Sequence, residues 1–204
     1  MMPRTTLAFD GSAIDSSAYR DVTRLADHAP GWLDGAVSAW STYGLMVFAV
    51  LMVVAWWRAR RASATAAVAA LAVPVVVVAA YALNDVLKML VREDRPCQSL
   101  HVATLEACPA PGDWSFPSNH AAIAAAAAMA LLFVSRRLGV LAVVAACAMA
   151  ASRVWVGAHY PHDAAAGLLV GAVVGALLML AVHRWPAALA RRLAATRLRF
   201  LLEV

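Results

Sequence analysis

The sequence predicts an all-α fold, a polytopic membrane helix bundle of about five transmembrane helices preceded by an amphipathic amino-terminal helix. The 204 residues are 63% hydrophobic with a mean hydropathy of +0.72, which excludes a disordered or ordinary soluble protein. The apolar residues fall in long segments, and the cations cluster just beyond the segment ends. At this length we expect residues 1–204 to form a single integral-membrane domain.

Residues 13–28 are the expected amphipathic helix. Apolar residues recur there at helical spacing, and charged residues such as Asp15 and Arg24 occupy the other faces, a pattern typical of a helix lying on a membrane surface. Pro30 and Gly31 end it. Five spanning segments follow, over about residues 36–57, 64–90, 121–134, 138–151 and 164–182.

The third and fourth segments are shorter than the about 20 residues that a span needs. They reach that length only if the third begins at Phe116 and the fourth continues through Arg153 toward Ala158. Polar side chains would then lie at membrane depth, where irregular backbone is tolerated only around a cavity within the bundle. We therefore expect an internal polar pocket.

Arginine clusters indicate the orientation. They link segments one and two, link segments three and four, and follow segment five, so an alternating path places them all on one side. By the positive-inside rule that side is the cytoplasm, with the carboxyl terminus, and the polar pocket faces outward. Their position beside apolar segments argues against a nucleic-acid partner. Because the first basic cluster follows the first apolar segment, we expect an uncleaved anchor and no secretory signal peptide.

The cysteines agree with this orientation. Cys97 and Cys108 bracket a loop on the expected outward side, where a disulfide is stable, and Cys147 lies within a span. We predict a Cys97–Cys108 disulfide. The alternative is two free thiols packed beneath the loop.

Three polar stretches, residues 88–96, 116–120 and 152–163, interrupt the apolar pattern. They place Lys, Arg, His and Asp at the ends of apolar segments, where each charge costs about 2.5–3.5 kcal/mol on insertion scales. A shared anion would neutralise the cations. The anion that we expect is phosphate.

The first stretch carries a candidate cationic clamp. Lys88 and Arg95 are seven residues apart, so a helix continued to Arg95 would present both on one face before Pro96 breaks it. Arginine can grip phosphate oxygens with two parallel hydrogen bonds. The alternative is a pair of anchors that reach the lipid headgroups.

The second stretch begins the third span. A helix amino terminus offers free N–H groups to an anion, Ser118 adds a hydroxyl donor, and His120 can protonate a leaving oxygen. The alternative is a capping Ser118 or Asn119 followed by a packed histidine.

The third stretch holds a candidate nucleophile. His159 and Asp163 are four residues apart, so the carboxylate can fix the imidazole tautomer and leave the other ring nitrogen free to attack. Arg153 lies one short loop away, and we treat His162 as a bystander. The alternative is a purely structural His–Asp hydrogen bond. Because three cations would repel a metal ion, we expect neither a metal nor another cofactor.

These stretches resemble the three-part signature of the type-2 phosphatidic acid phosphatase superfamily, Lys-x6-Arg-Pro, Pro-Ser-Gly-His and Ser-Arg-x5-His-x3-Asp. The superfamily contains bacterial membrane lipid phosphatases and soluble vanadium haloperoxidases. The resemblance covers residues 88–163 in the family's order and spacing. One position departs, since Asn119 stands where the family has Gly and would tolerate a positive φ less comfortably. We expect this change to tune the site.

The resemblance implies a metal-independent mechanism. His159 attacks phosphorus in line and forms a phosphohistidine, and Asp163 orients it. His120 protonates the leaving group and then activates water. The implied phosphate-binding residues are Lys88, Arg95, Ser118, Asn119 and Arg153.

Within the superfamily the chain looks most like the small bacitracin-resistance type of undecaprenyl-pyrophosphate phosphatase, from its compactness, its Tyr-Gly-Leu span and its Phe-Pro-Ser-x-His motif. This implies hydrolysis of undecaprenyl or decaprenyl pyrophosphate to the monophosphate at the outer face of a bacterial plasma membrane, which recycles the carrier lipid of peptidoglycan synthesis. The alternative substrates are phosphatidylglycerol phosphate, phosphatidic acid and a polyprenyl-phosphoryl sugar phosphate. A non-catalytic lipid or anion transporter is the alternative from another class. The expected partners are thus the lipid substrate and the bilayer, and the oligomeric state is left open.

Overall fold

The computed structural model describes residues 8–202, which form nine α-helices and one short 3-10 helix and contain no strand. This confirms the all-α class. In chain order the elements are α1 (Ser12–Asp27), α2 (Gly31–Tyr43), α3 (Leu45–Arg60), α4 (Ala64–Val91), α5 (Pro96–Leu100), α6 (Asn119–Val134), α7 (Arg136–Trp155), α8 (Pro161–Arg184), α9 (Pro186–Ala194) and η1 (Arg197–Leu201).

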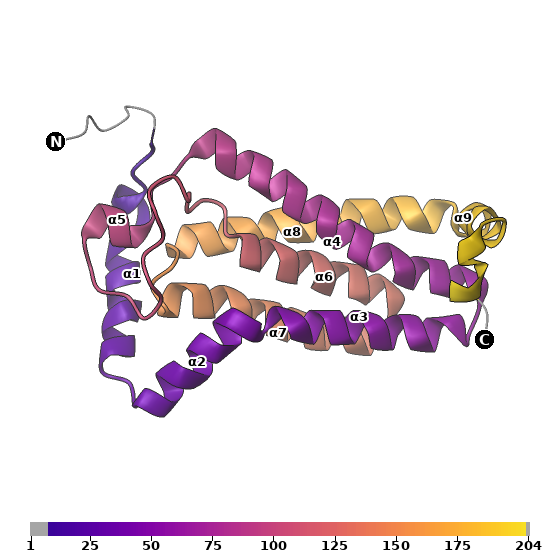
Figure 1. Cartoon of the computed structure of the whole chain (residues 1–204), viewed down its shortest axis with the longest axis horizontal. Helices are drawn as coiled ribbons and strands as arrows, with labels where there is room; N and C mark the ends of the chain where they lie inside the picture. The colour runs from indigo at the N-terminus through magenta and orange to yellow at the C-terminus, as the bar shows by residue number, and fades with distance from the viewer. Residues whose placement is uncertain (1–7, 203–204) are drawn as a thin grey trace.

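Helix α6 is the central element of the bundle. It packs against α3, α4, α7 and α8, which run along the length of the molecule (Figure 1). Helices α1 and α5 and the loop before α6 cover one end, and α9 and η1 cover the other. The polar stretches of the sequence all end at the face covered by α1 and the loop.

Among the described residues, three of the five expected spans are single helices of spanning length, and a fourth is a bent pair. Helices α4, α7 and α8 are each long and apolar enough to cross a membrane, and α6 is a shorter apolar helix. The first expected span is a bent pair, α2 and α3, with an angle of 53° between them. The bend falls at Gly44, where a Cβ would clash with the Trp40 ring and with Met149.

The ends of two helices differ from the sequence prediction. The prediction that the third span begins at Phe116 was wrong, because α6 begins at Asn119 after an extended Ser118 with a ψ of 119°. Helix α7 does continue through Arg153 and ends at Trp155, before Gly157 takes a φ of +81°.

Lys88 and Arg95 do not lie on one continuous helix, contrary to the prediction. Helix α4 ends at Val91 because Arg92 adopts a left-handed conformation with a φ of 54°, and its N–H donates to the carbonyl of Lys88. Pro96 then starts α5 instead of breaking a helix, since a proline is well tolerated at the first helical position. The chain therefore turns between the two cations.

Small residues bring α6 and α8 into close contact. Gly167, Gly171 and Gly175 recur every fourth residue along α8, and a Cβ at Gly171 would collide with the backbone of Ala122. Such small-residue stripes let membrane helices approach until their backbones touch. The contact holds the first turns of both helices together, and the Ser118 N–H donates to the Asp163 carbonyl at 3.0 Å.

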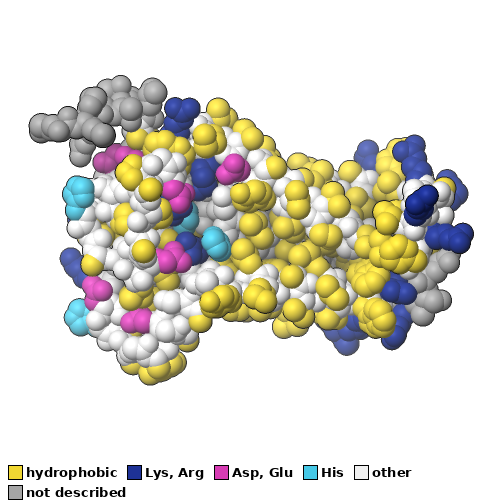
Figure 2. Space-filling view, in the orientation of Figure 1, with side chains coloured by type: hydrophobic (Ala, Val, Ile, Leu, Met, Phe, Trp, Pro, Cys, Tyr) yellow, Lys and Arg dark blue, Asp and Glu magenta, His cyan; other side chains and the backbone are white. Residues whose placement is uncertain are grey.

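Charge is separated along the long axis (Figure 2). A band of apolar side chains covers the middle of the visible face, arginine and lysine side chains gather at the α9 end, and acidic and histidine side chains gather at the opposite end. This is the pattern of a membrane-spanning bundle with two chemically different ends.

We expect Gly171→Leu to destabilise the protein, because its side chain has no space between α8 and α6. Overpacking typically costs about 1–3 kcal/mol. Thermal unfolding in detergent measures the effect, with Val173→Leu as the matched control, since Val173 is exposed on the same helix. Equal melting temperatures for the two variants would contradict this account of the packing.

Candidate active site

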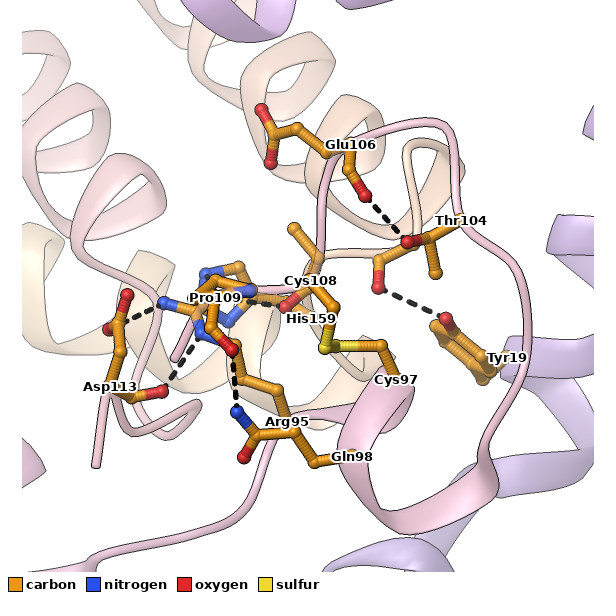
Figure 3. The surroundings of a disulfide bond; sticks show 12 residues. Tyr19, Arg95, Cys97, Gln98, Thr104, Glu106, Cys108, Pro109, Asp113 and His159 are labelled. Carbon is orange, nitrogen blue, oxygen red and sulfur yellow. Dashed lines mark hydrogen bonds and ion pairs between the residues drawn. A yellow bond between two sulfur atoms is a disulfide. The ribbon is translucent and has the colours of Figure 1, made fainter. Parts of the chain in front are cut away.

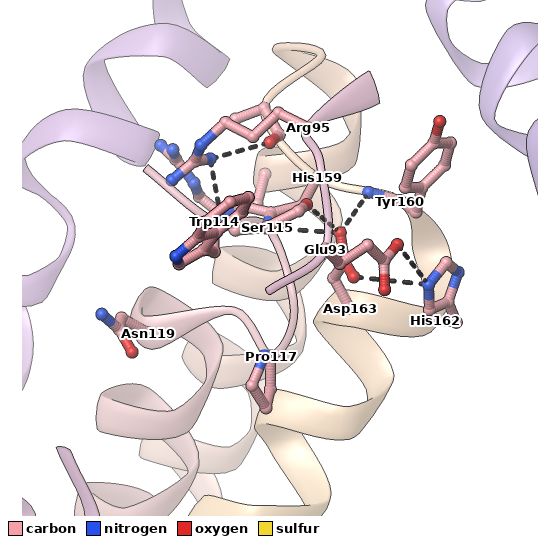
Figure 4. A network of polar contacts seen from close by, with 12 residues as sticks. Glu93, Arg95, Trp114, Ser115, Pro117, Asn119, His159, Tyr160, His162 and Asp163 are labelled. Carbon is pink, nitrogen blue, oxygen red and sulfur yellow. Dashed lines mark hydrogen bonds and ion pairs between the residues drawn. The ribbon is translucent and has the colours of Figure 1, made fainter. Parts of the chain in front are cut away.

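The three polar stretches meet at the end of the bundle covered by α1. The site is built from the end of α4, residues 92–95, the loop before α6, the first turn of α6, the end of α7, and the loop that enters α8. Figure 4 shows how side chains from the loop and from the start of α8 converge.

A fully buried carboxylate orients the candidate nucleophile. Asp163 lies in the first turn of α8 and is 0% exposed, and its Oδ2 accepts the Tyr160 N–H at 2.8 Å. The same oxygen lies 3.5 Å from Nδ1 of His159 and accepts a hydrogen bond from the Ser115 hydroxyl. The structure thus confirms the prediction that the His159 ring and the Asp163 carboxylate lie side by side.

His159 is buried and neutral. Its side chain is 3% exposed, and burial lowers its pKa to about 3, against the opposing effect of Asp163. At neutral pH the ring therefore carries one proton. Nδ1 faces Asp163, so Nε2 is the ring nitrogen that remains for chemistry, and it lies 3.4 Å from Nη1 of Arg95.

Lys88, Arg95 and Arg153 are all buried although each is a cation, and the charges of Arg95 and Lys88 act on the His159 ring. Arg95 donates from Nη1 to the Ala158 carbonyl at 2.9 Å, on the loop that carries His159. Lys88 donates from Nζ to the Trp114 carbonyl at 2.7 Å. Backbone carbonyls therefore hold two of the cations beside the candidate nucleophile.

Two loop carboxylates neutralise the arginines, a feature that the sequence analysis missed. Glu106 accepts two hydrogen bonds from Arg153, at 2.8 and 2.7 Å, and Asp113 accepts one from Nη2 of Arg95 at 2.9 Å. Only the general rule that buried charges are paired pointed to such partners. The loop thus places carboxylate oxygens where the guanidinium groups could bind another oxyanion.

The predicted Cys97–Cys108 disulfide is present and closes this loop (Figure 3). It joins α5 to the segment that carries Glu106 and Asp113, and Gln98 donates to the Pro109 carbonyl at 2.9 Å beside it. The covalent link therefore fixes the base of the loop over the site.

The start of α6 supplies the remaining predicted residues. Ser118 is the N-cap residue of α6, and its hydroxyl is buried without a hydrogen-bond partner among the described residues. His120 follows in the first turn, where the charges of Arg153, Arg95 and Lys88 act on its ring. All three stretches therefore lie at one end of the bundle, and the prediction that they line one pocket stays a prediction.

Asn119 is held by a partner that the sequence analysis did not identify. Its Oδ1 accepts a hydrogen bond at 2.6 Å from Asn84, a buried residue of α4. A positive φ, which Asn would tolerate less comfortably than Gly, is not required here, because Asn119 is the first residue of α6 and the positive-φ residues other than glycine in the described chain are Arg92 and His101. Asparagine is therefore accommodated without backbone strain.

One cluster has the ligand types of a metal site. Glu93, His162 and Asp163 place an oxygen, a ring nitrogen and an oxygen within 4.8 Å of one another. Nε2 of His162 already lies 2.9 Å from Oε1 of Glu93. The cluster is therefore hydrogen-bonded within itself, and His162, which the sequence analysis treated as a bystander, contacts the carboxylate that orients His159.

We expect Ser115→Ala to reduce turnover by about tenfold, because the Ser115 hydroxyl bonds the carboxylate that orients His159. Phosphate release by the purified variant measures the loss, and Ser16→Ala in α1 is the control. Wild-type turnover in Ser115→Ala would show that this hydroxyl does not support the site.

The comparisons with known proteins agree on one family. The chain is 29% identical over 150 residues to undecaprenyl-diphosphatase BcrC of Bacillus subtilis, covering 74% of this chain and 75% of that protein. It is 42% identical over 100 residues to decaprenylphosphoryl-5-phosphoribose phosphatase of Mycobacterium tuberculosis, but this match spans only 48% of the chain and 53% of that protein.

A solved structure has the same fold. The crystal structure of a transmembrane PAP2-type phosphatidylglycerolphosphate phosphatase from Bacillus subtilis superposes with a TM-score of 0.61 at 22% identity, covering 83% of this chain and 86% of that one. The PAP2 superfamily matches residues 69–187, which are more than half of the chain. The match includes all three polar stretches. The chain is a multi-pass membrane protein that belongs to the PAP2 superfamily of phosphatases.

Proposed function

We propose that the protein hydrolyses a polyprenyl diphosphate, such as undecaprenyl or decaprenyl diphosphate, to the monophosphate and inorganic phosphate. The observation that carries the proposal is the buried, neutral His159, which is held by Asp163 and lies beside the buried cations Lys88 and Arg95. The undecaprenyl-diphosphatase relative, which aligns over three quarters of both chains, supports this substrate class.

The geometry favours attack by Nε2 of His159 on the terminal phosphorus. A nitrogen–phosphorus bond forms as the bridging phosphorus–oxygen bond breaks, and His120 gives a proton to the leaving polyprenyl monophosphate. Positive charge develops on the His159 ring and is stabilised by Asp163. Water activated by His120 then cleaves the nitrogen–phosphorus bond and releases phosphate, which restores the neutral histidine.

Lys88, Arg95 and Arg153 stabilise the charge on the phosphoryl oxygens, assisted by the Ser118 hydroxyl and the Asn119 backbone. In this mechanism the phosphate replaces the carboxylates of Glu106 and Asp113 on the two arginines, since guanidinium groups bind either oxyanion in the same way. No step requires a metal ion, so we expect metal-independent turnover.

The two charged ends support an orientation in a bacterial plasma membrane. We place the arginine-rich end and the carboxyl terminus in the cytoplasm and the active site outside. The disulfide over the site fits an oxidising exterior. The diphosphate headgroup then enters from the outer leaflet while the polyprenyl tail stays in lipid.

A second candidate is a phosphatase for a polyprenyl-phosphoryl sugar phosphate. The relative from Mycobacterium tuberculosis, named for activity on decaprenylphosphoryl-5-phosphoribose, is more similar in sequence over the part that aligns. The same nucleophile and cations would serve that phosphomonoester.

Phosphate release from a panel of lipids tests the function. The panel contains undecaprenyl and decaprenyl diphosphate, a polyprenyl-phosphoryl sugar phosphate, phosphatidic acid and phosphatidylglycerol phosphate, each with and without EDTA. We expect the fastest turnover on the diphosphates and no effect of EDTA. Preference for a phosphatidate, or strict dependence on magnesium, would contradict the proposal.

Three variants accompany the panel. His159→Ala and His120→Ala should each lower turnover by about a thousandfold or more, since they remove the nucleophile and the general acid. Arg136→Ala at the opposite end of the bundle should retain near-normal activity.

A further inference from the structure

Helix α1 is attached to the loop that carries the candidate nucleophile. Tyr19 is fully buried, its hydroxyl donates to the Gly157 carbonyl at 3.0 Å, and its ring packs against Tyr160 with centroids 5.5 Å apart. The surface helix and the entry to α8 therefore form one packed unit.

Asp15 makes the most specific contact of α1. The backbone leaves the helical conformation at this residue, with a φ of −146° and a ψ of 29° inside an otherwise helical segment. Its Oδ2 accepts the backbone N–H of His162 at 2.7 Å, and its Oδ1 lies 2.8 Å from Nδ1 of the same residue. One side chain thus caps the first turn of α8 and holds the His162 ring.

The opposite edge of the His162 ring, which carries Nε2, lies beside two buried carboxylates. Nε2 of His162 lies 2.9 Å from Oε1 of the buried Glu93 and 3.4 Å from Oδ1 of Asp163. Tyr160 and Phe116 stack on the ring, with centroids 5.4 and 5.9 Å away. A protonated ring donates from both nitrogens and would satisfy the ionised carboxylates of Asp15 and Glu93, so we take His162 to be the cation of this cluster.

The His162 ring lies beside Oδ1 of Asp163, the carboxylate oxygen that has no hydrogen-bond donor among the described residues. Oδ1 is buried and has no hydrogen-bond partner among the described residues, whereas Oδ2 is held by Tyr160 and Ser115. Burial also raises the pKa of Glu93, and the hydrogen bond from His162 opposes that rise. Without His162, three carboxylates would face one another with no cation between them.

We propose that Asp15 and His162 are positioning residues that keep Asp163 ionised and directed at His159, and so couple the surface helix α1 to the nucleophile. The inference rests on the proposed hydrolase function. The inference predicts that the two residues act on the chemical step and not on lipid binding, because their contacts are with each other, Glu93 and Asp163.

Steady-state kinetics of the full chain in lipid nanodiscs, with undecaprenyl diphosphate as substrate, tests the proposal. His162→Gln and Asp15→Asn should each lower kcat by about 10- to 100-fold with KM changed by less than about twofold. The kcat of the double variant should be about equal to that of the less active single variant, since the two residues act as one unit. Asp21→Asn, an exposed carboxylate on the same helix, is the matched control and should match wild type.

Orthovanadate gives a second readout that does not depend on the lipid substrate. As a trigonal-bipyramidal mimic of phosphorus under attack, it should bind the His162→Gln and Asp15→Asn variants about tenfold more weakly than wild type, by thermal shift. If wild type binds vanadate but does not hydrolyse the diphosphate, the proposed function fails while the vanadate comparison still decides the role of His162.

Three results would overturn the proposal. One is wild-type kcat and vanadate affinity in both variants, and another is a loss confined to KM. The third is one equivalent of metal in purified wild type, measured by mass spectrometry, that is lost in His162→Gln, because His162 would then be a metal ligand instead of a hydrogen-bond donor.

Discussion

The site depends on one carboxylate that is completely removed from water. Asp163 is 0% exposed, and an isolated buried charge would be too costly to persist. The surrounding structure supplies a hydroxyl from Ser115, a backbone N–H from Tyr160 and two imidazoles on opposite sides, His159 and His162. Tyr160, His159 and His162 lie within four residues of Asp163 at the start of α8, whereas Ser115 comes from the loop before α6. The environment of this carboxylate therefore combines one local turn with a hydroxyl from a distant loop.

Close packing of apolar helices holds the segments of the site together. The glycine stripe of α8 lets α6 approach until the N–H of Ser118 reaches the carbonyl of Asp163. On the face that Figure 2 shows, charged side chains collect at the two ends, with an apolar band between them. The same arrangement that suits a bilayer thus places a dense polar site beneath a loop closed by a disulfide.

Local patterns were sufficient to predict much of this molecule. The apolar segments predicted the spanning helices, and the four-residue spacing of His159 and Asp163 predicted their pairing, which the turn entering α8 brings about. The Cys97–Cys108 disulfide followed from its place in a loop between spans. In each case the partners are close in sequence or the signal is a long run of one residue type.

Contacts between distant or irregular segments could not be predicted. The left-handed Arg92 turned the chain after α4, and no residue type there signals a positive φ. Glu106 and His162 read as ordinary loop and helix residues, because their partners, Arg153 and Asp15, lie 47 and 147 positions away. Such pairs appear only once α1 and the loop have docked on the bundle.

Detection of a phosphorylated intermediate tests the central claim most directly. The full chain is mixed with undecaprenyl diphosphate labelled in its terminal phosphate, quenched within milliseconds at alkaline pH, where phosphohistidine is stable, and digested for mass spectrometry. The account predicts label on the peptide that contains His159, at Nε2, and none in the His159→Ala variant. Turnover without any labelled peptide, or label on His120, would contradict it.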